Sequence, residues 1–522
     1  MSIYAKNPIM PGFYPDPSIC AVGEDYYLIN STFAYFPGLS LMHSKDLVHW
    51  EQIGNVMDRN SQLPLMKAGH SQGLFAPTIR YHEGVFYVIC TNVSHGGNYI
   101  VTATNPEGPW SEPYYIEGAD GIDPSLFFDE DGTCYYIGTR PNPEGVGHNG
   151  DWYIYIQEMD LENWCLKGEY KLVWNGAMRK AEWPEGPHLY KKDGWYYILH
   201  AEGGTGPAHA VCVARSKEIY GPYEGNLMNP IITHRHLGKD YPIRYVGHAD
   251  LFEDSEGNWY AVMLASRPCE WHTNLGRETF LAKVTWEDGW PVCNAGIGML
   301  EDTVTVPLKE TEGQELITSG KDANGIPFHM VMLRNPVPGT AKGEGDGYRI
   351  QLLPYTLSQM EPAAYLGIRQ TSYHFTVKTN LSFAPEKNGE MAGLALFQCE
   401  ASYVAVVYGR FDEKTQVRVI KNSRDLDAEP AYPVKCVEEV LASADVSAEN
   451  ICFTITQKGQ KADISYSIGD VEKTLVTGLS TKFLSTESAG GFVGCTVGMY
   501  ASASGAESAN SAYFTGIDYT DL

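Results

Sequence analysis

The chain has 522 residues, which is too long for one ordinary hydrophobic core, so we expect two domains. Hydrophobic residues make up 43% of the sequence, as in folded globular proteins. The sequence has no run of about 18 apolar residues, so no membrane span is expected. The net charge of −26 argues against nucleic acids and anionic membranes as partners, and it is compatible with a neutral small substrate.

The 11 Cys residues are scattered along the chain without a Cys-x-x-Cys pair. An odd number in this pattern argues against a disulfide framework and against a metal finger. The amino terminus, Met1 to Pro8, lacks the apolar segment of a signal peptide. These features predict reduced thiols and a cytoplasmic location.

One motif occurs five times in the first half of the chain. Each copy has a turn-like lead-in, an apolar strand start, a tight turn and a strand rich in Tyr or Trp. The copies are spaced by roughly 47 to 63 residues, and Gly and Pro separate them with almost no helical pattern. Repeats of this length are typical of four-stranded propeller blades. The lead-ins are Asp16-Pro17-Ser18, Ala76-Pro77-Thr78, Asp123-Pro124-Ser125, Gly186-Pro187-His188 and His248-Ala249-Asp250.

The repeat ends after Trp290-Pro291, and residues 303–327 have the composition of a connector. Short alternating strands without a blade repeat follow, which predicts a β-sandwich. The expected strands are Ser372–Leu381, Ala392–Phe397, Tyr403–Tyr408, Gln416–Ile420, Ile451–Thr456, Ala462–Ile468 and a terminal strand over Ala512–Tyr519. We therefore predict an all-β fold, with a five-bladed β-propeller at residues 1–310 and a jelly-roll-like β-sandwich at residues 311–522.

The innermost strand of each propeller blade begins near the central channel, so the blade heads should converge. This brings Asp16, Asp123, Glu185 and His248 together. Asp-Pro-Ser can also be a simple turn in which Asp caps backbone N–H groups, but a generic propeller needs no acids at its axis. Converging carboxylates suit glycoside hydrolysis. One acid protonates the leaving oxygen, a second carboxylate activates water or attacks, and a third raises the pKa of the acid.

Aromatic residues are abundant, with 34 Tyr and 11 Trp. They fit a protein that stacks on sugar rings, although β-rich cores also use many Tyr residues.

The chain resembles glycoside hydrolase family 43, in particular its two-domain β-xylosidases. The resemblance covers nearly the whole chain. It is carried by Tyr14 to Ser18, Asn30 to Phe33, His43 to Trp50, Ala76 to Tyr81, Gly121 to Ser125, Glu185 to Lys191, Ala201 to Thr205, Gly247 to Leu251, Asn274 to Leu281, Tyr365 to Gln370 and Glu390 to Gln398.

The resemblance implies an inverting mechanism. In it Asp16 is the general base that activates water, Glu185 is the general acid, and Asp123 positions the acid and tunes its pKa. An inverting pair of carboxyl groups should lie roughly 6.5–9.5 Å apart, which leaves room for the water.

The resemblance also implies residues that bind the sugar. Arg277 would contact sugar hydroxyls, unless it only forms a surface ion pair with Glu278. Phe33 would wall the sugar subsite, unless it is a core residue. Phe75 stands where relatives usually have Trp, which leaves the subsite preference open. An aromatic residue of the sandwich closes the pocket in related enzymes, and Phe492 is the candidate here.

For His248 the resemblance suggests a hydrated calcium ion on the propeller axis, with a structural or electrostatic role. The alternative is that His248 only hydrogen-bonds a core water. No organic cofactor is expected.

These features predict an exo-acting β-1,4-xylosidase that releases D-xylose from the non-reducing end of xylo-oligosaccharides. The first alternative is an α-L-arabinofuranosidase, or an enzyme with both activities, because the two sugars present similar hydroxyls near the cleaved bond. The second is a sugar-binding propeller without turnover. The expected partner is a small oligosaccharide, and the sequence leaves open whether the chain forms a homo-oligomer.

Overall fold

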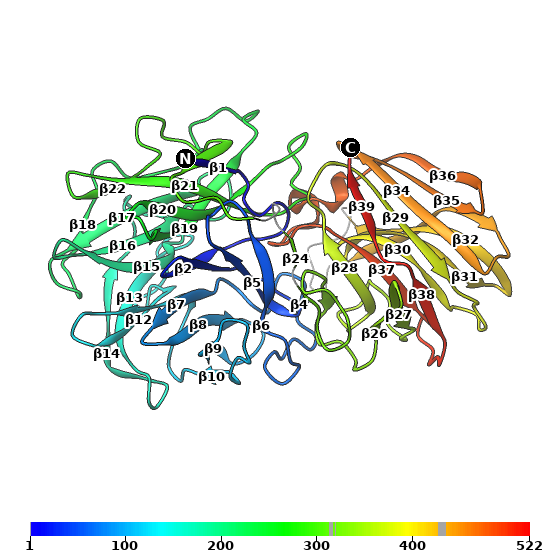
Figure 1. Ribbon diagram of the computed structural model, residues 1–522, viewed down its shortest axis with the longest axis horizontal. Helices are drawn as coiled ribbons and strands as arrows, with labels where there is room; N and C mark the ends of the chain where they lie inside the picture. The colour runs from blue at the N-terminus through cyan, green and yellow to red at the C-terminus, as the bar shows by residue number, and fades with distance from the viewer. Residues whose placement is uncertain (1, 313–316, 319, 426–434) are drawn as a thin grey trace.

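The computed structural model describes residues 2–312, 317–318, 320–425 and 435–522. Two β-rich lobes lie side by side along the long axis of the molecule (Figure 1). Among the described residues the helical structure is one 3₁₀ turn, η1 (Lys482–Leu484), and one short helix, α1 (Thr486–Ala489). None of the described helices could cross a membrane. The all-β prediction is therefore confirmed.

The amino-terminal lobe is the expected five-bladed propeller, and each blade is an antiparallel sheet of four main strands. Blade one is β2 (Ser18–Val22), β3 (Asp25–Ile29), β5 (Gly38–Ser44) and β6 (Glu51–Met57), with β24 (Ile317–Thr318) added at its edge. Blade two is β7 (Thr78–His82), β8 (Val85–Asn92), β9 (Gly97–Ala103) and β10 (Tyr114–Tyr115). Blade three is β11 (Ile122–Phe128), β12 (Cys134–Pro141), β13 (Trp152–Asp160) and β14 (Cys165–Trp174). Blade four is β15 (Glu185–Lys192), β16 (Trp195–Glu202), β17 (Ala210–Ser216) and β18 (Glu224–Gly225). Blade five is β19 (Arg244–Glu253), β20 (Trp259–Ser266), β21 (Glu278–Glu287) and β22 (Trp290–Cys293).

The innermost strands contact one another in a closed ring, in the order β2, β7, β11, β15, β19 and back to β2. A middle strand of a blade is covered on both faces by neighbouring blades, so β20 is buried at almost every position. This explains why the second strand of each repeat is apolar and aromatic rather than strictly alternating. The outer strand β14, by contrast, is exposed over most of its length.

The ring is closed by the chain ahead of blade one. The side chain of Asn7 bonds the backbone of Leu281 in blade five at 2.8 and 2.9 Å, and Met10 pairs with Thr279 of the same blade. β1 (Ile3–Lys6) pairs with β23 (Thr303–Val306). Residues 303–306 were predicted to be part of a connector, and this was wrong. Their Thr-Val-Thr-Val alternation buries both Val side chains in a strand.

The carboxy-terminal lobe is a sandwich of two antiparallel sheets. The larger sheet contains β26 (Ala341–Glu344), β27 (Gly347–Gln351), β38 (Ser511–Phe514), β29 (His374–Ser382), β34 (Asn450–Lys458), β35 (Lys461–Ile468), β36 (Val471–Ser480) and β39 (Asp518–Asp521). The smaller sheet contains β28 (Ala364–Arg369), β37 (Thr496–Ser502), β30 (Met391–Cys399), β31 (Ser402–Phe411), β32 (Lys414–Arg424) and β33 (Cys436–Asp445). The predicted terminal strand is broken into β38 and β39, because Gly516 between them has a φ of +100° that a strand cannot contain.

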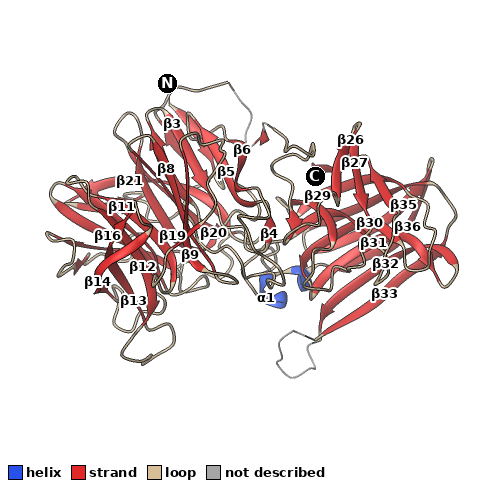
Figure 2. Cartoon of the chain, turned by 90° about the horizontal axis from the view of Figure 1, so that it is seen from below, coloured by secondary structure: helices blue, strands red, loops and turns tan. Residues whose placement is uncertain are grey.

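The lobes are joined through short pairings and the segment around α1 (Figure 2). β25 (Met332–Leu333) pairs with β4 (Tyr35–Phe36) of the propeller, and Arg369 of the sandwich donates to the carbonyl of Phe13 at 2.7 Å. The predicted domain boundary between residues 310 and 311 lies in the stretch between β23 and β25, and its position stays a prediction.

Candidate active site

A cavity of about 400 Å³ lies where the blade heads meet the sandwich, and it contains all eight residues singled out from the sequence. The three acids Asp16, Asp123 and Glu185 come from the heads of blades one, three and four. The full lining is Asp16, Phe33, Phe75, Ala76, Ile122, Asp123, Trp152, Trp183, Glu185, Gly204, Thr205, His248, Arg277 and Phe492.

The same backbone feature recurs at the blade heads. Asp16, Asp123 and His248 have φ values of 50°, 53° and 50°, and Gly186 has a φ of 56° directly after Glu185. The ladder register is irregular at the heads of β11, β15 and β19. Left-handed backbone in a non-glycine residue is strained and tends to occur at functional sites. Asp123 and His248 lie at these irregular points and Glu185 directly precedes one, and all three side chains line the cavity.

Asp16 is held as an ionised carboxylate. Arg277 donates to both of its oxygens, at 2.6 Å and 3.1 Å, and the Ser31 hydroxyl donates a further short hydrogen bond. Burial alone would raise the pKa of Asp16, but the charges of Arg277 and His248 and these hydrogen bonds outweigh burial and lower it.

Glu185 is in the opposite state. Its pKa is raised well above the ordinary value, first by burial and then by the negative charges of Asp123 and Asp16. Asp123 is intermediate: burial and Asp16 raise its pKa to about 6, against the charge of His248 and the N–H of Gly186, which donates at 3.1 Å. The cavity therefore holds one carboxylate that stays charged and one carboxyl group that keeps its proton.

His248 packs against the backbone of blade four. A Cβ at Gly186 would lie 2.9 Å from the His248 ring, so glycine is needed for this approach. The Nδ1 atom of His248 is 4.0 Å from the Asp16 carboxylate, which Arg277 already neutralises. Ca²⁺ takes about six to eight oxygen ligands, and this donor set fits it poorly. The cation at His248 stays a prediction, and no step of the reaction is assigned to it.

Three phenylalanine rings form an apolar wall. The Phe33 ring stacks on Phe492, with centroids 6.1 Å apart, and meets Phe75 edge-on at 5.4 Å. Phe33 is 2% exposed, so it both packs in the core and lines the cavity. Phe492 brings the sandwich into the site: its N–H donates to the Ser71 hydroxyl of the propeller at 2.8 Å.

Arg277 lies beside two of these rings, with its guanidinium carbon 5.7 Å from the Phe33 centroid and 5.6 Å from that of Phe492. The alternative ion pair with Glu278 is wrong. Glu278 is buried and pairs with Arg267 at 2.7 Å, because neighbouring residues at the start of a strand point in different directions.

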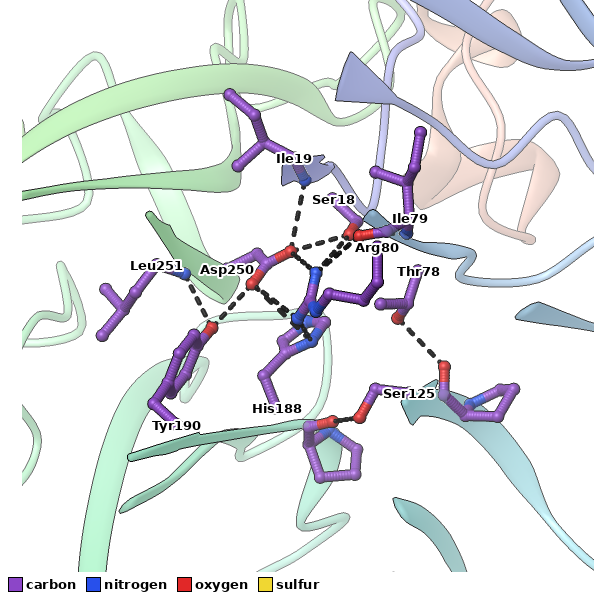
Figure 3. A network of polar contacts seen from close by, with 12 residues as sticks. Ser18, Ile19, Thr78, Ile79, Arg80, Ser125, His188, Tyr190, Asp250 and Leu251 are labelled. Carbon is purple, nitrogen blue, oxygen red and sulfur yellow. Dashed lines mark hydrogen bonds and ion pairs between the residues drawn. The ribbon is translucent and has the colours of Figure 1, made fainter. Parts of the chain in front are cut away.

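Beneath the heads, the propeller axis is filled by a polar network (Figure 3). Arg80 of blade two donates to both oxygens of Asp250 of blade five, at 2.9 and 3.1 Å. Asp250 also accepts from Ser18 of blade one at 2.7 Å and from Tyr190 of blade four at 2.6 Å. A separate bond ties blade three to blade four, where Ser125 donates to the Pro187 carbonyl at 2.6 Å. Side-chain bonds from all five blades therefore link the innermost strands to one another.

Sequence reasoning missed some of the site. Trp152 and Trp183 line the cavity, and Ser31 bonds the base candidate. Trp183 lies two residues before Glu185, and an aromatic residue so close to an acidic blade head was a usable signal. Trp152 starts β13, the third strand of blade three, and lies away from the blade heads that the repeat marks.

Residues 5–291 match the glycosyl hydrolases family 43. The chain belongs to glycoside hydrolase family 43. Residues 322–520 match the β-xylosidase carboxy-terminal concanavalin A-like domain, so this family 43 enzyme has the two-domain organisation that its sequence predicts.

Relatives of the family 43 enzyme align over nearly its whole length. A xylosidase/arabinosidase of Butyrivibrio fibrisolvens is 49% identical, covering 98% of this chain and 99% of the relative. A non-reducing end α-L-arabinofuranosidase of Bacteroides ovatus is 34% identical, covering 99% and 95%. Among solved structures, a xylan β-1,4-xylosidase from Bacillus halodurans C-125 superposes with a TM-score of 0.89 at 32% identity, covering 99% of this chain and 100% of that one.

Proposed function

We propose that this family 43 glycoside hydrolase is an inverting exo-β-1,4-xylosidase that releases D-xylose from the non-reducing end of xylo-oligosaccharides. The observation that carries the proposal is the pair of opposite pKa shifts in one cavity, lowered at Asp16 and raised at Glu185. Inverting hydrolysis needs one carboxylate and one carboxylic acid at neutral pH.

In the proposed mechanism Glu185 gives its proton to the glycosidic oxygen as the C1–O bond breaks. Asp16 accepts a proton from the water that forms the new bond to C1 on the opposite face of the sugar. The net reaction adds one water, and the product has inverted configuration at C1. Asp123 keeps Glu185 protonated between turnovers, because its negative charge raises the pKa of the acid.

Exo action is supported by the shape of the site. Phe492 of the sandwich forms part of the cavity wall, beside Phe33 and Phe75 of the propeller. A cavity of about 400 Å³ is in the range of small-ligand pockets rather than of a long open groove.

The second candidate is α-L-arabinofuranosidase activity, alone or beside the first. It is favoured by the name of the 49% identical relative, xylosidase/arabinosidase, and by that of the 34% identical arabinofuranosidase. A binding propeller without turnover is disfavoured, because all three carboxyl groups lie in the cavity.

The test compares turnover of p-nitrophenyl β-D-xyloside and p-nitrophenyl α-L-arabinofuranoside, with xylobiose as the natural substrate. A higher xyloside rate supports the proposal, and a higher arabinofuranoside rate moves the substrate to the second candidate. We expect Glu185→Ala to cut xylobiose turnover by at least about 100-fold, the usual scale for losing a general acid.

The control is Glu182→Ala, which removes an exposed carboxylate three residues away. Activated nitrophenyl substrates need little acid help, so the loss should be smaller on them than on xylobiose. Equal, small losses on both substrates would remove Glu185 from the mechanism.

All 11 Cys side chains are free thiols. This supports a reducing, cytoplasmic compartment, which we propose as the site of action.

A further inference from the structure

Blade four holds a compact cluster of one His, one Glu and one Cys side chain outside the active site. His200 and Glu202 lie two residues apart on β16 and therefore share one face of the strand. Cys212 on β17 is the direct antiparallel partner of His200. Donor atoms of the three side chains all lie within 4.8 Å of one another. Two adjacent strands, rather than a mobile loop, thus fix the three donors.

The three side chains are buried, with exposed fractions of 0% for His200, 4% for Glu202 and 0% for Cys212. Neither ring nitrogen of His200 makes a hydrogen bond of normal geometry. The nearer one, Nε2, is 3.5 Å from a Glu202 oxygen, and the Cys212 sulfur is 3.3 Å from the other. A buried imidazole that makes no hydrogen bond of normal geometry is costly, and a bound cation would satisfy it.

We propose that His200, Glu202 and Cys212 form a zinc-binding site in blade four. One imidazole nitrogen, one thiolate and one carboxylate are ligands of a borderline metal such as Zn²⁺, whereas Ca²⁺ and Mg²⁺ prefer oxygen alone. Three protein ligands leave the fourth tetrahedral position to a water. Binding forms a Zn–S bond to Cys212 and releases the thiol proton to solvent.

The site lies directly behind the segment that leads into the general acid. A Glu202 oxygen accepts the N–H of Ala177 at 2.9 Å, and Gly203 donates to the Glu182 carbonyl at 2.7 Å. The same segment carries Trp183 of the cavity wall. Most side chains from Asn175 to Lys180 are exposed, so a short segment at the surface separates the proposed ion site from solvent.

The first experiment titrates the untagged, chelator-treated full chain with CoCl₂. We expect one Co²⁺ per chain, with the thiolate-to-cobalt charge-transfer band and the intense visible bands of a tetrahedral sulfur-ligated site. Addition of ZnCl₂ should bleach these bands. A spectrum without sulfur ligation, or no binding, overturns the proposal without the use of any variant.

The second experiment measures Zn²⁺ affinity calorimetrically for Cys212→Ser and His200→Gln. We expect each to weaken binding by at least about 10- to 100-fold, a loss that even outer-shell changes can cause. The matched control is Cys293→Ser, which alters a buried thiol in blade five. Wild-type affinity in Cys212→Ser, or an equal loss in Cys293→Ser, would contradict the assignment.

Discussion

At the scale of single residues, the surroundings of two carboxyl groups decide their chemistry. Asp16 and Glu185 line the same cavity, but only Asp16 has a cation bound to both oxygens. Glu185 has no such cation, and burial together with the two acidic neighbours Asp123 and Asp16 raises its pKa. A difference in partners, with burial common to both, therefore separates the proposed base from the proposed acid.

The role of Asp123 can be tested through pH dependence. The low pKa of Asp16 should set the acidic limb of the rate profile, and the raised pKa of Glu185 the alkaline limb. The negative charge of Asp123 raises the pKa of Glu185, so Asp123→Asn should lower it and move the alkaline limb to lower pH. We expect a turnover loss of about 100-fold on xylobiose. An alkaline limb that stays in place would show that Asp123 does not tune the acid.

The acids could be predicted from the sequence because the repeat assigns each of them to a blade head. The partner of Asp16 was harder to predict. Arg277 directly precedes β21 and Glu278 begins it, and side-chain alternation could have excluded a pair between them. Trp152 and Ser31 could not be found, because Trp152 begins the third strand of blade three and Ser31 follows β3, so neither stands at the head position that the repeat marks.

At the scale of elements, the segment between β20 and β21 carries Arg277 and is fixed by the sandwich. Glu487 of α1 accepts from the N–H of Thr273 at 2.7 Å and from its hydroxyl at 2.8 Å. Asn274 adds a side-chain bond to the Thr481 carbonyl at 2.8 Å, and its own carbonyl accepts the N–H of Cys495 at 2.7 Å. The sandwich therefore holds in place Arg277, the residue that lowers the pKa of the proposed base Asp16.

Loss of this attachment should reach the active site. We expect Glu487→Ala to lower kcat/KM by about tenfold, the equivalent of one charged hydrogen bond. Because Arg277 lowers the pKa of Asp16, a looser Arg277 should also move the acidic limb to higher pH. Glu449→Ala, another exposed carboxylate of the sandwich, should leave both quantities unchanged. An unshifted acidic limb in Glu487→Ala would separate the attachment from Arg277.

The axis network joins the blades as a second element of the design. Asp250→Asn leaves Arg80 without its ionic partner in a buried site, so we expect the free energy of unfolding at pH 7 to fall by about 3–5 kcal/mol. Burial raises the pKa of Asp250, but the charges of Arg80 and His188 lower it by more than burial raises it, so the net shift is downward. The contribution is thus present above the unfolded pKa of about 3.9 and lost as the pH falls towards the folded pKa.

Denaturant unfolding of wild type and variant at several pH values measures this difference. Asp193→Asn, which breaks an exposed pair with Lys192, should change stability by less than about 1 kcal/mol. An Asp250→Asn effect as small as that of the control would mean that the blades do not depend on the axial ion pair.

Strands with a buried face could be predicted from the sequence, and polar edge strands could not. β29 and β34 alternate between buried and exposed residues, and both were expected. β33 and β36 have almost no buried side chains, so they carry no hydrophobic period. Their strand conformation comes from pairing with β32 and β35.

At the scale of the whole molecule, the buried Arg334 contacts both the propeller and the sandwich. Arg334 is 1% exposed and follows β25. It donates to the Ala68 carbonyl of the propeller at 2.8 Å and forms a short ion pair with Glu400 of the sandwich. Ala68 lies three residues before Ser71, which holds the backbone of Phe492. The Arg334 contact between the lobes and the Phe492 wall of the cavity therefore rest on the same short segment of the propeller, residues 68–71.

Arg334→Met tests this coupling, because it keeps the apolar stem and removes the charge. The Glu400 carboxylate, which is 14% exposed, would lose its partner, and we expect a loss of about 3–5 kcal/mol in the free energy of unfolding. Scanning calorimetry should show one transition for wild type and two for the variant, as the lobes unfold separately. KM should rise more than kcat falls, since Phe492 moves while the acids stay in the propeller.

The control variant Arg349→Met breaks an exposed pair with Glu344 inside the sandwich, and it should change neither the number of transitions nor KM. A single transition with unchanged KM in Arg334→Met would mean that the lobes are coupled elsewhere.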